Sequence, residues 1–240
     1  MDPFVQQLHN LCAAHPTRAK WVFVRSHAIG HTIGDRLVLE GTNWGNLRFV
    51  TPLDIATRMG APFLVERGIA PSEEGLGPAL MMRLLIGLPD RHTYFRPLAD
   101  QPQLAAALWS TLRELRLAGV TAVDIAQAPF ASHAKRDELV ALVEAYESFL
   151  NAEKRGDVAT VFAEALKHSD WCPIAAGDCW TEQPDVLWPP LVRRLIDAMP
   201  GERLVPAAIE LPGLSAPRRL HDARIPDAAG ELWGWSQDTS

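Results

Sequence analysis

A small group of basic and hydroxyl side chains near the N-terminus has the composition of a phosphate-contact site. Its members are Arg25, Ser26, His27, Arg48 and Thr51. They lie within or just after two apolar segments, residues 21–24 and 47–50. A hydroxyl between a strand and a helix accepts hydrogen bonds from the first helical N–H groups, and that end of a helix attracts anions. The pattern predicts contacts with DNA phosphate or sugar. Plain helix caps, an exposed histidine and surface salt bridges are the ordinary alternative.

A second group suggests zinc. His168, Cys172 and Cys179 carry ligand atoms that zinc prefers, but their spacing matches no common zinc site and a fourth ligand is not evident. Buried or loop thiols are therefore the favoured interpretation, and we expect no metal site. The sequence also contains neither a G-x-S-x-G nor an H-E-x-x-H motif.

Three tryptophans gather near a proline-rich segment, at positions 171, 180 and 188. Tryptophan rings stack on the bases of single-stranded nucleic acid. Packing between a sheet and neighbouring helices is the commoner use of such side chains, and we expect it here. The paired arginines 193–194 and 218–219 are expected to be solvated rather than bound to phosphate.

The elements that must position the N-terminal group follow from hydrophobic spacing. We expect a helix over residues 3–14, a buried strand over 21–24, and a helix that begins after Ser26 and ends at Gly41. A second strand over 47–50 leads to a helix with Thr51 as its cap. Strand, helix, strand in this order predicts a parallel sheet.

The middle of the chain has a different pattern. Four apolar stripes at helical spacing predict a helical block over residues 72–169 without strands. Strands are expected again at 172–176 and 204–211, with a helix over about 191–199 between them. We therefore divide the chain into a first α/β segment (1–71), a helical insertion (72–169), a return to the α/β lobe (170–214) and an irregular tail (215–240). The natural chain is expected to continue beyond that tail.

Composition limits the functional classes. The 240 residues carry a net charge of −6, so the chain as a whole is not basic, and DNA contact would need a local basic groove or a partner. The three cysteines do not form a disulfide framework. Neither a signal peptide nor a membrane-spanning run is evident, and we expect a cytoplasmic protein.

Two segments resemble a known family. The sequence VFVRSH at 22–27, leading to GDRL at 34–37, and the sequence LRFVTPLDIA at 47–56 resemble the DNA-contacting elements of superfamily-1 helicases. The order of elements is similar to the N-terminal part of AddB/RecC-like proteins, the exonuclease V type in double-strand-break repair. Lys135 and the helix that ends near Tyr146 resemble the helical lobe of AddB-type proteins. The implied fold is α/β, with a parallel sheet of degenerate helicase (P-loop-like) type and a large helical insertion.

The chain departs from that family where ATP would bind. Nothing before Trp21 supplies the phosphate loop G-x-x-x-x-G-K-[ST], and the glycines at 30 and 34 have no lysine beside them. Asp178 takes the place of the metal-holding aspartate, but Cys179 stands where the family has a glutamate. The resemblance thus implies a degenerate Mg/ATP site at Asp178 and Cys179, and no ATP hydrolysis.

We therefore expect a non-catalytic scaffold or DNA-guiding module of a repair helicase–nuclease. It would contact single-stranded or forked DNA, need no cofactor, and work with a helicase or nuclease partner subunit. A PD-(D/E)XK nuclease domain could lie beyond residue 240. Two alternatives stay open: a small α/β hydrolase or transferase that uses Arg25, His27 and Asp178, and a structural module whose helical block binds another protein.

Overall fold

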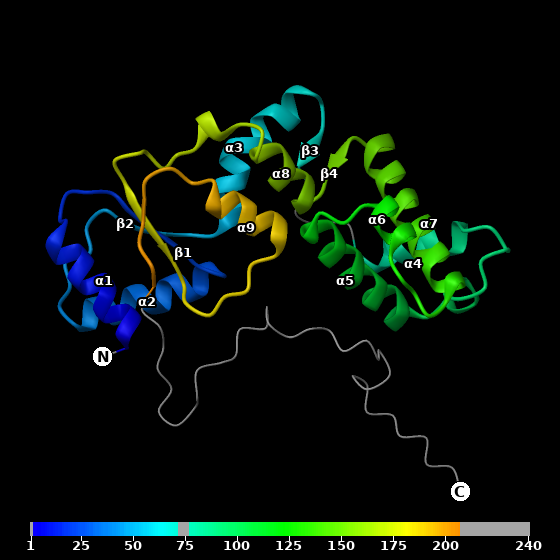
Figure 1. Cartoon of the computed structure of the whole chain (residues 1–240), viewed down its shortest axis with the longest axis horizontal. Helices are drawn as coiled ribbons and strands as arrows, with labels where there is room; N and C mark the ends of the chain where they lie inside the picture. The colour runs from blue at the N-terminus through cyan, green and yellow to red at the C-terminus, as the bar shows by residue number, and fades with distance from the viewer. Residues whose placement is uncertain (1, 72–76, 207–240) are drawn as a thin grey trace, which may run out of the picture.

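The computed structural model describes residues 2–71 and 77–206. They form two neighbouring lobes: an α/β lobe on the left of Figure 1 and a helical lobe on the right. The expected tail, residues 215–240, lies outside the described residues, as do positions 207–211 of the last expected strand. Between the lobes, α5 (Pro102–Ala118) of the helical lobe packs against α8 (Val158–Ala165) and α9 (Pro190–Asp197) of the α/β lobe.

A parallel sheet forms the centre of the α/β lobe. Its described strands, in spatial order, are β2 (Leu47–Val50), β1 (Lys20–Phe23), β5 (Cys179–Glu182) and β6 (Glu202–Arg203). Each neighbouring pair in it is parallel. The α/β class, the parallel sheet and the first two strands are therefore confirmed, with β1 beginning one residue earlier than expected.

Helices cover both faces of this sheet. One face carries α1 (Pro3–Ala14) and α2 (His27–Leu39), which pack against Val22 and Val24. The other face carries Trp21, Phe23 and the helices α3 (Pro52–Glu66), α8 (Val158–Ala165) and α9 (Pro190–Asp197). Because successive side chains of a strand point to opposite faces, a strand covered on both sides is apolar throughout, as β1 is after Lys20.

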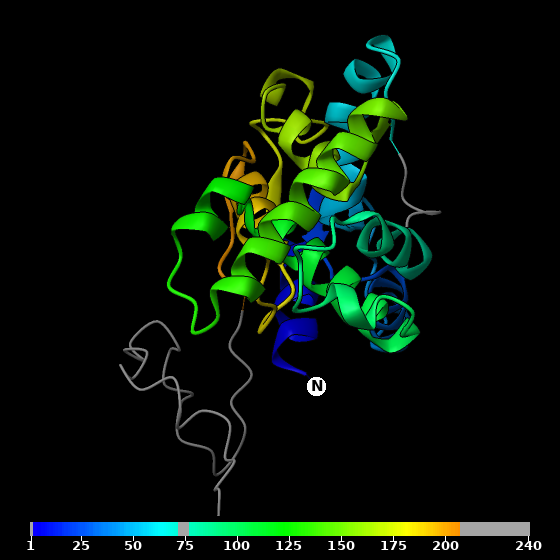
Figure 2. The same ribbon diagram turned by 90° about the vertical axis from the view of Figure 1, so that its right-hand side faces the viewer.

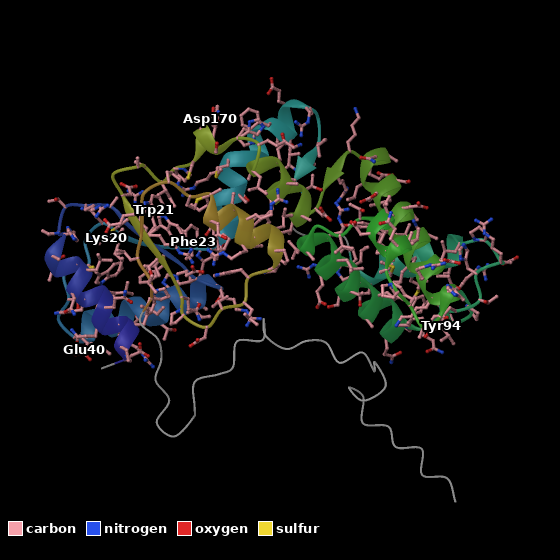
Figure 3. The ribbon with its side chains drawn as sticks, viewed as in Figure 1. Lys20, Trp21, Phe23, Glu40, Tyr94 and Asp170 are labelled. Carbon is pink, nitrogen blue, oxygen red and sulfur yellow. The ribbon has the colours of Figure 1, made fainter. Side chains whose placement is uncertain are left out.

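Lys20 is the one charged residue of β1, and it is fully buried. Its ammonium donates to the carbonyl oxygens of His15, at 2.7 Å, and Arg18, at 2.8 Å. These bonds hold the connection between α1 and β1. Figure 3 shows Lys20, Trp21 and Phe23 inside the α/β lobe, whereas Glu40, Tyr94 and Asp170 lie at the periphery of the molecule.

The helical lobe has a core of its own. Its described α-helices are α4 (Pro78–Gly87), α5 (Pro102–Ala118), α6 (Ala122–Gln127) and α7 (His133–Ala152), with a 3₁₀ turn at Arg96–Leu98. Figure 2 turns this lobe toward the viewer. Buried Glu138 accepts hydrogen bonds from the backbone N–H groups of Tyr94, Phe95 and Arg96, and thereby holds the segment before that turn. The first three expected helical stripes are confirmed.

The fourth stripe, however, packs elsewhere. Helix α8 lies against α3 in the α/β core and not with the helical block in which its sequence was placed. The approach is close: a Cβ added at Gly60 of α3 would lie 2.8 Å from the nitrogen of Ala165. The block also contains a short strand, β4 (Arg155–Gly156), parallel to β3 (Ala70–Pro71). The expectation of a strand-free block to residue 169 was therefore wrong, because the α/β lobe resumes at β4.

The last part of the sheet also differs from expectation. Residues 172–176 contain two bends and the start of a turn but no strand, and the strand is β5, which begins only at Cys179. The described positions of the strand expected at 204–211, residues 204–206, are not in a strand. The short strand β6 lies just before them, and the Leu204 N–H still donates to the Trp180 oxygen at 2.8 Å. A further 3₁₀ turn spans Ser169–Trp171. Within the described ranges, no helix is long and apolar enough to cross a membrane.

Candidate functional site

The candidate site is a groove at one edge of the sheet. The carboxyl ends of β1, β2 and β5 meet at this edge because the three strands run in the same direction. After β1 the chain passes to the face of α2, and after β2 it passes to the face of α3. A change of face between adjacent parallel strands opens a crevice at their carboxyl ends. The groove there measures about 440 Å³, and its lining includes Arg25, Ser26, His27 and Thr51.

Two helix N-termini enter this groove. The Ser26 hydroxyl accepts the N–H of Ile29 at 3.4 Å and caps α2. The Thr51 hydroxyl accepts the N–H of Asp54 at 3.2 Å, while the Asp54 carboxylate accepts the N–H of Thr51 at 2.7 Å. This reciprocal pair is a capping box at the start of α3. Both predicted caps are confirmed, and both helices direct the positive ends of their dipoles at the groove.

His27 and Asp54 connect the two helix starts. The His27 Nε2 atom lies 3.3 Å from Asp54 Oδ2, and the imidazole is 61% exposed. With neighbouring Ser26 as the nucleophile, His27 as the base and Asp54 as the acid that orients it, the groove contains the three side-chain types of a nucleophilic triad. The Ser26 hydroxyl, however, makes no hydrogen bond to His27 in the described structure, and an activated nucleophile requires such a bond. The three side chains therefore do not form a catalytic relay.

Arg25 supplies a cation at the groove. Its backbone N–H donates to the Gln183 side chain at 3.2 Å, which ties the end of β1 to the loop after β5. Its side chain is exposed, and no described residue pairs with the guanidinium. A guanidinium without a partner can form charge-assisted hydrogen bonds to an incoming anion.

The apolar part of the groove includes Trp188, which precedes α9. Its indole N–H donates to Glu182 Oε2 at 2.9 Å. Glu182 ends β5 and is buried, and it also accepts from Arg193 and Arg203, each at 2.7 Å. The role of Glu182 is not evident from the sequence, because its two cationic partners stand 11 and 21 positions away along the chain.

Arg48, the fifth predicted contact residue, does not line the groove. It lies inside β2 opposite Trp21, and its guanidinium stacks over the Trp21 ring at 4.7 Å from the ring centre. Two further residues of β2 follow Arg48, so its side chain does not reach the carboxyl end of the strand, where the other four predicted contact residues lie.

Asp178 and Cys179 lie at the opposite edge of the sheet. Cys179 begins β5 and pairs with Lys20 at the start of β1, so neither residue is at a carboxyl end. The Asp178 carboxylate accepts from the Trp21 indole at 2.9 Å and from the Ala175 N–H at 3.0 Å. Burial raises the pKa of the Cys179 thiol and keeps it neutral. The structure therefore does not bring the pair expected to form a degenerate Mg/ATP site to the carboxyl edge, where open parallel sheets bind their ligands.

The hydrolase alternative depended on Arg25, His27 and Asp178 acting together. The structure places Asp178 at the amino edge, so this constellation is not assembled. The zinc alternative concerned His168, Cys172 and Cys179. Across residues 2–71 and 77–206, no group of three or more histidine, cysteine or acidic side chains could hold a metal ion. His168 stacks on Phe63, and the Cys172 sulfur lies 3.6 Å from that of Met199.

A smaller cavity of about 200 Å³ adjoins the groove on the other side of His27. It lies between α2 and β2, beside Trp44 and Phe49. Gly30 allows the helix to approach the strand, because a Cβ there would lie 2.8 Å from the Phe49 Cβ. The shared residue His27 makes the two cavities neighbouring parts of one surface.

The chain matches no family model and no curated protein. Its site must therefore be interpreted from its own chemistry. The groove combines a guanidinium that no described residue pairs with, two helix N-termini and an apolar wall, which together suit a ligand with both a phosphate and a flat apolar part.

Proposed function

We propose that this chain is a helicase-like, DNA-guiding module that binds single-stranded or forked DNA at the carboxyl edge of its sheet, without hydrolysing ATP. One observation carries the proposal: Arg25, Ser26, His27 and Thr51, which are separated by up to 26 positions, line one groove. The AddB/RecC-like resemblance of the same segments adds the biological setting, a double-strand-break repair complex in which a partner subunit supplies the motor.

Neither the segment before β1 nor the connection after it contains a phosphate loop, and this supports the absence of ATP chemistry. Residues 3–19, before β1, contain no glycine. A phosphate loop needs several glycine N–H groups and a lysine between the strand and its helix. Here β1 ends at Phe23 and α2 begins at His27, so only three residues, Val24, Arg25 and Ser26, separate them. They include neither a glycine nor a lysine, and they cannot wrap around a triphosphate.

The acidic residue at this edge supports the same conclusion. Glu182 ends β5, where a metal-holding carboxylate would be useful. Both of its oxygens already accept hydrogen bonds from arginine, and one also binds the Trp188 indole. A carboxylate neutralised by two guanidinium groups is a weak ligand for Mg²⁺, which prefers hard, negatively charged oxygens.

The charge of the groove supports an anionic ligand despite the net charge of −6. Arg25 has no acidic partner in the described structure, whereas His27 faces Asp54. One such guanidinium and two helix dipoles predict modest affinity with few phosphate contacts. Such binding weakens as salt rises, with a slope of about −0.7 in log–log units for each contact with single-stranded DNA.

Binding of fluorescently labelled oligonucleotides to the full chain tests the proposal. We expect single-stranded and forked DNA to bind, and Arg25→Ala to weaken binding and reduce the salt slope by roughly one contact. The matched control is Arg91→Ala, an exposed arginine of the helical lobe without a partner in the described structure. No DNA binding at low salt, or tight binding of Mg-ATP, would show that the proposal is wrong.

A further inference from the structure

We propose that Trp188 is a base-binding residue of the groove, on which one unpaired base of single-stranded DNA stacks. This inference rests on the proposed function and adds to it a residue and a preference for bases over bare phosphates. It concerns the apolar wall of the groove, whereas the proposed function concerns its cationic and dipolar side.

The ring of Trp188 packs against the α/β core but also lines the groove, and its surroundings differ from those of two other tryptophans. Two other tryptophans of this lobe have a guanidinium over the ring: Arg48 lies 4.7 Å from the centre of Trp21, and Arg203 lies 5.4 Å from that of Trp180. In the described part of the chain, no aromatic ring or cation stacks on Trp188 in this way. The indole is half-buried and lines the groove, so a flat ligand can reach it.

Hydrogen bonds orient the Trp188 ring before any ligand binds. Its N–H donates to Glu182 Oε2 at 2.9 Å, and Glu182 is itself held by Arg193 and Arg203 at 2.7 Å. Arg193 is fixed in turn by Asp197, at 2.7 Å. A ring held by such a network loses little conformational freedom when a ligand binds, and this favours affinity.

The groove has the composition and size of a ligand pocket. Leu53, Phe162 and Val192 line it together with Trp188, and Arg25 belongs to the same lining. Its volume of about 440 Å³ is within the range of roughly 300–1,000 Å³ found for ligand pockets. Bases in a duplex stack on each other and their faces are not available, whereas a base in a single strand can stack on an aromatic side chain. The occupant that fits is therefore one nucleotide of a single strand.

The experiment compares two oligonucleotides of equal length and equal phosphate number. One is oligothymidylate, and the other carries abasic sites in place of the thymidines. We expect the full chain to bind oligothymidylate about fivefold or more tightly than the abasic strand, since stacking of one base has an effect of this size. Trp188→Ala should bind both strands with the affinity of the wild type for the abasic strand.

Two further variants control for packing. Trp188→Leu keeps an apolar side chain against the α/β core but cannot stack, and we expect it to lose the base preference as well. Trp171→Ala removes another tryptophan, 55% exposed and in contact with Phe63 away from the groove, and it should behave as the wild type. Thermal unfolding of each variant identifies any loss of folding, and Trp188→Leu decides the question if Trp188→Ala does not fold.

The outcomes separate this inference from the proposed function. If the wild type binds both strands equally, or if Trp188→Leu keeps the preference for bases, the inference is overturned while phosphate binding at the groove stands. If neither strand binds at low salt, the proposed function fails and the inference fails with it. A preference that depends on Trp171 instead would place the base contact elsewhere and overturn the inference.

Discussion

Arg116 and Asp157 join the two lobes through a two-point ion pair. Arg116 belongs to α5, and Asp157 caps α8; the Nε–Oδ2 distance is 2.5 Å and the Nη2–Oδ1 distance is 3.3 Å. The Tyr146 hydroxyl of α7 donates to the same carboxylate at 3.3 Å. Because both charged side chains are largely buried, the position of the helical lobe depends on this carboxylate.

Asp157→Asn tests that dependence. Asparagine keeps an oxygen that can cap α8, but it removes the negative charge that faces Arg116. We expect the free energy of unfolding to fall by about 2 kcal/mol, since the Arg116 guanidinium loses its buried partner and keeps only Glu147, which is 44% exposed and lies 2.8 Å away. Urea denaturation measures this loss. Asp137→Asn is the control: Asp137 is 58% exposed in its pair with Arg136, and its replacement should change stability by less than about 0.5 kcal/mol. Equal effects of the two substitutions would contradict a structural role for the interlobe pair.

The contact between α3 and α8 gives a second prediction. A Cβ at position 60 would lie 2.8 Å from the Ala165 nitrogen and 2.9 Å from the Val161 oxygen, both rigid backbone atoms. Gly60→Ala should therefore destabilise the chain by about 1–3 kcal/mol, although alanine is the better helix former. At Gly87, which ends α4, a Cβ would meet no atom within 4 Å, and alanine there should be neutral or slightly stabilising. Thermal unfolding of both variants distinguishes close packing from helix propensity, and a stable Gly60→Ala variant would show that α3 and α8 can separate without cost.

The sequence predicted the parts of the fold that depend on local pattern. The first two strands and the caps at Ser26 and Thr51 were correct, because a buried strand and a helix start each have a signal within a few residues. Because the strand ends and helix starts were placed correctly from these local signals, four of the five predicted contact residues line one groove. Arg48 does not line it, and its distance from the end of β2 could not be judged without the strand's bounds.

The failures concern features that only the tertiary structure decides. The apolar spacing of α8 is the same whether it packs on α3 or on α7, so periodicity could not assign it to a lobe. Strand β5 ends in Glu182, which is buried only because distant arginines neutralise it, and its sequence therefore did not predict a strand. Strands of two residues, such as β3 and β4, are too short to show any period.

Acid should weaken the junction between α3 and α8 through Glu164. The Arg67 hydrogen bond, with help from Lys167 and His168, lowers the pKa of Glu164 to about 2, although burial opposes the shift. A carboxylate with a lowered pKa stabilises the folded state above its ordinary pKa of 4.5, and this stabilisation is lost as the pH falls from 4.5 toward about 2.

Glu164→Gln isolates this contribution. At pH 7 the variant should be less stable than the wild type, and the difference should narrow as the pH falls below about 4.5. Urea denaturation at pH 7, 5, 4 and 3 measures the difference. Glu144→Gln, on the exposed side of α7, is expected to show a small difference at every pH. A Glu164→Gln difference that stays constant between pH 6 and pH 3 would show that the ion pairs of Glu164 contribute nothing to stability.

Asp54 opposes the proposed binding of DNA, and its replacement should strengthen it. The carboxylate lines the groove, faces His27 at 3.3 Å and repels phosphate. In the variant Asp54→Asn, the amide oxygen could still accept the N–H of Thr51, so the start of α3 should keep its cap, with a loss of about 0.3–1 kcal/mol from the helix dipole. In screened solution, removal of one charge at this range should tighten binding of single-stranded DNA about twofold to threefold, and less at high salt. Fluorescence anisotropy at two salt concentrations measures both effects, with Asp137→Asn as the distant control. Weaker binding by Asp54→Asn would mean that the carboxylate orients His27 for the ligand, and unchanged binding would place the DNA away from this groove.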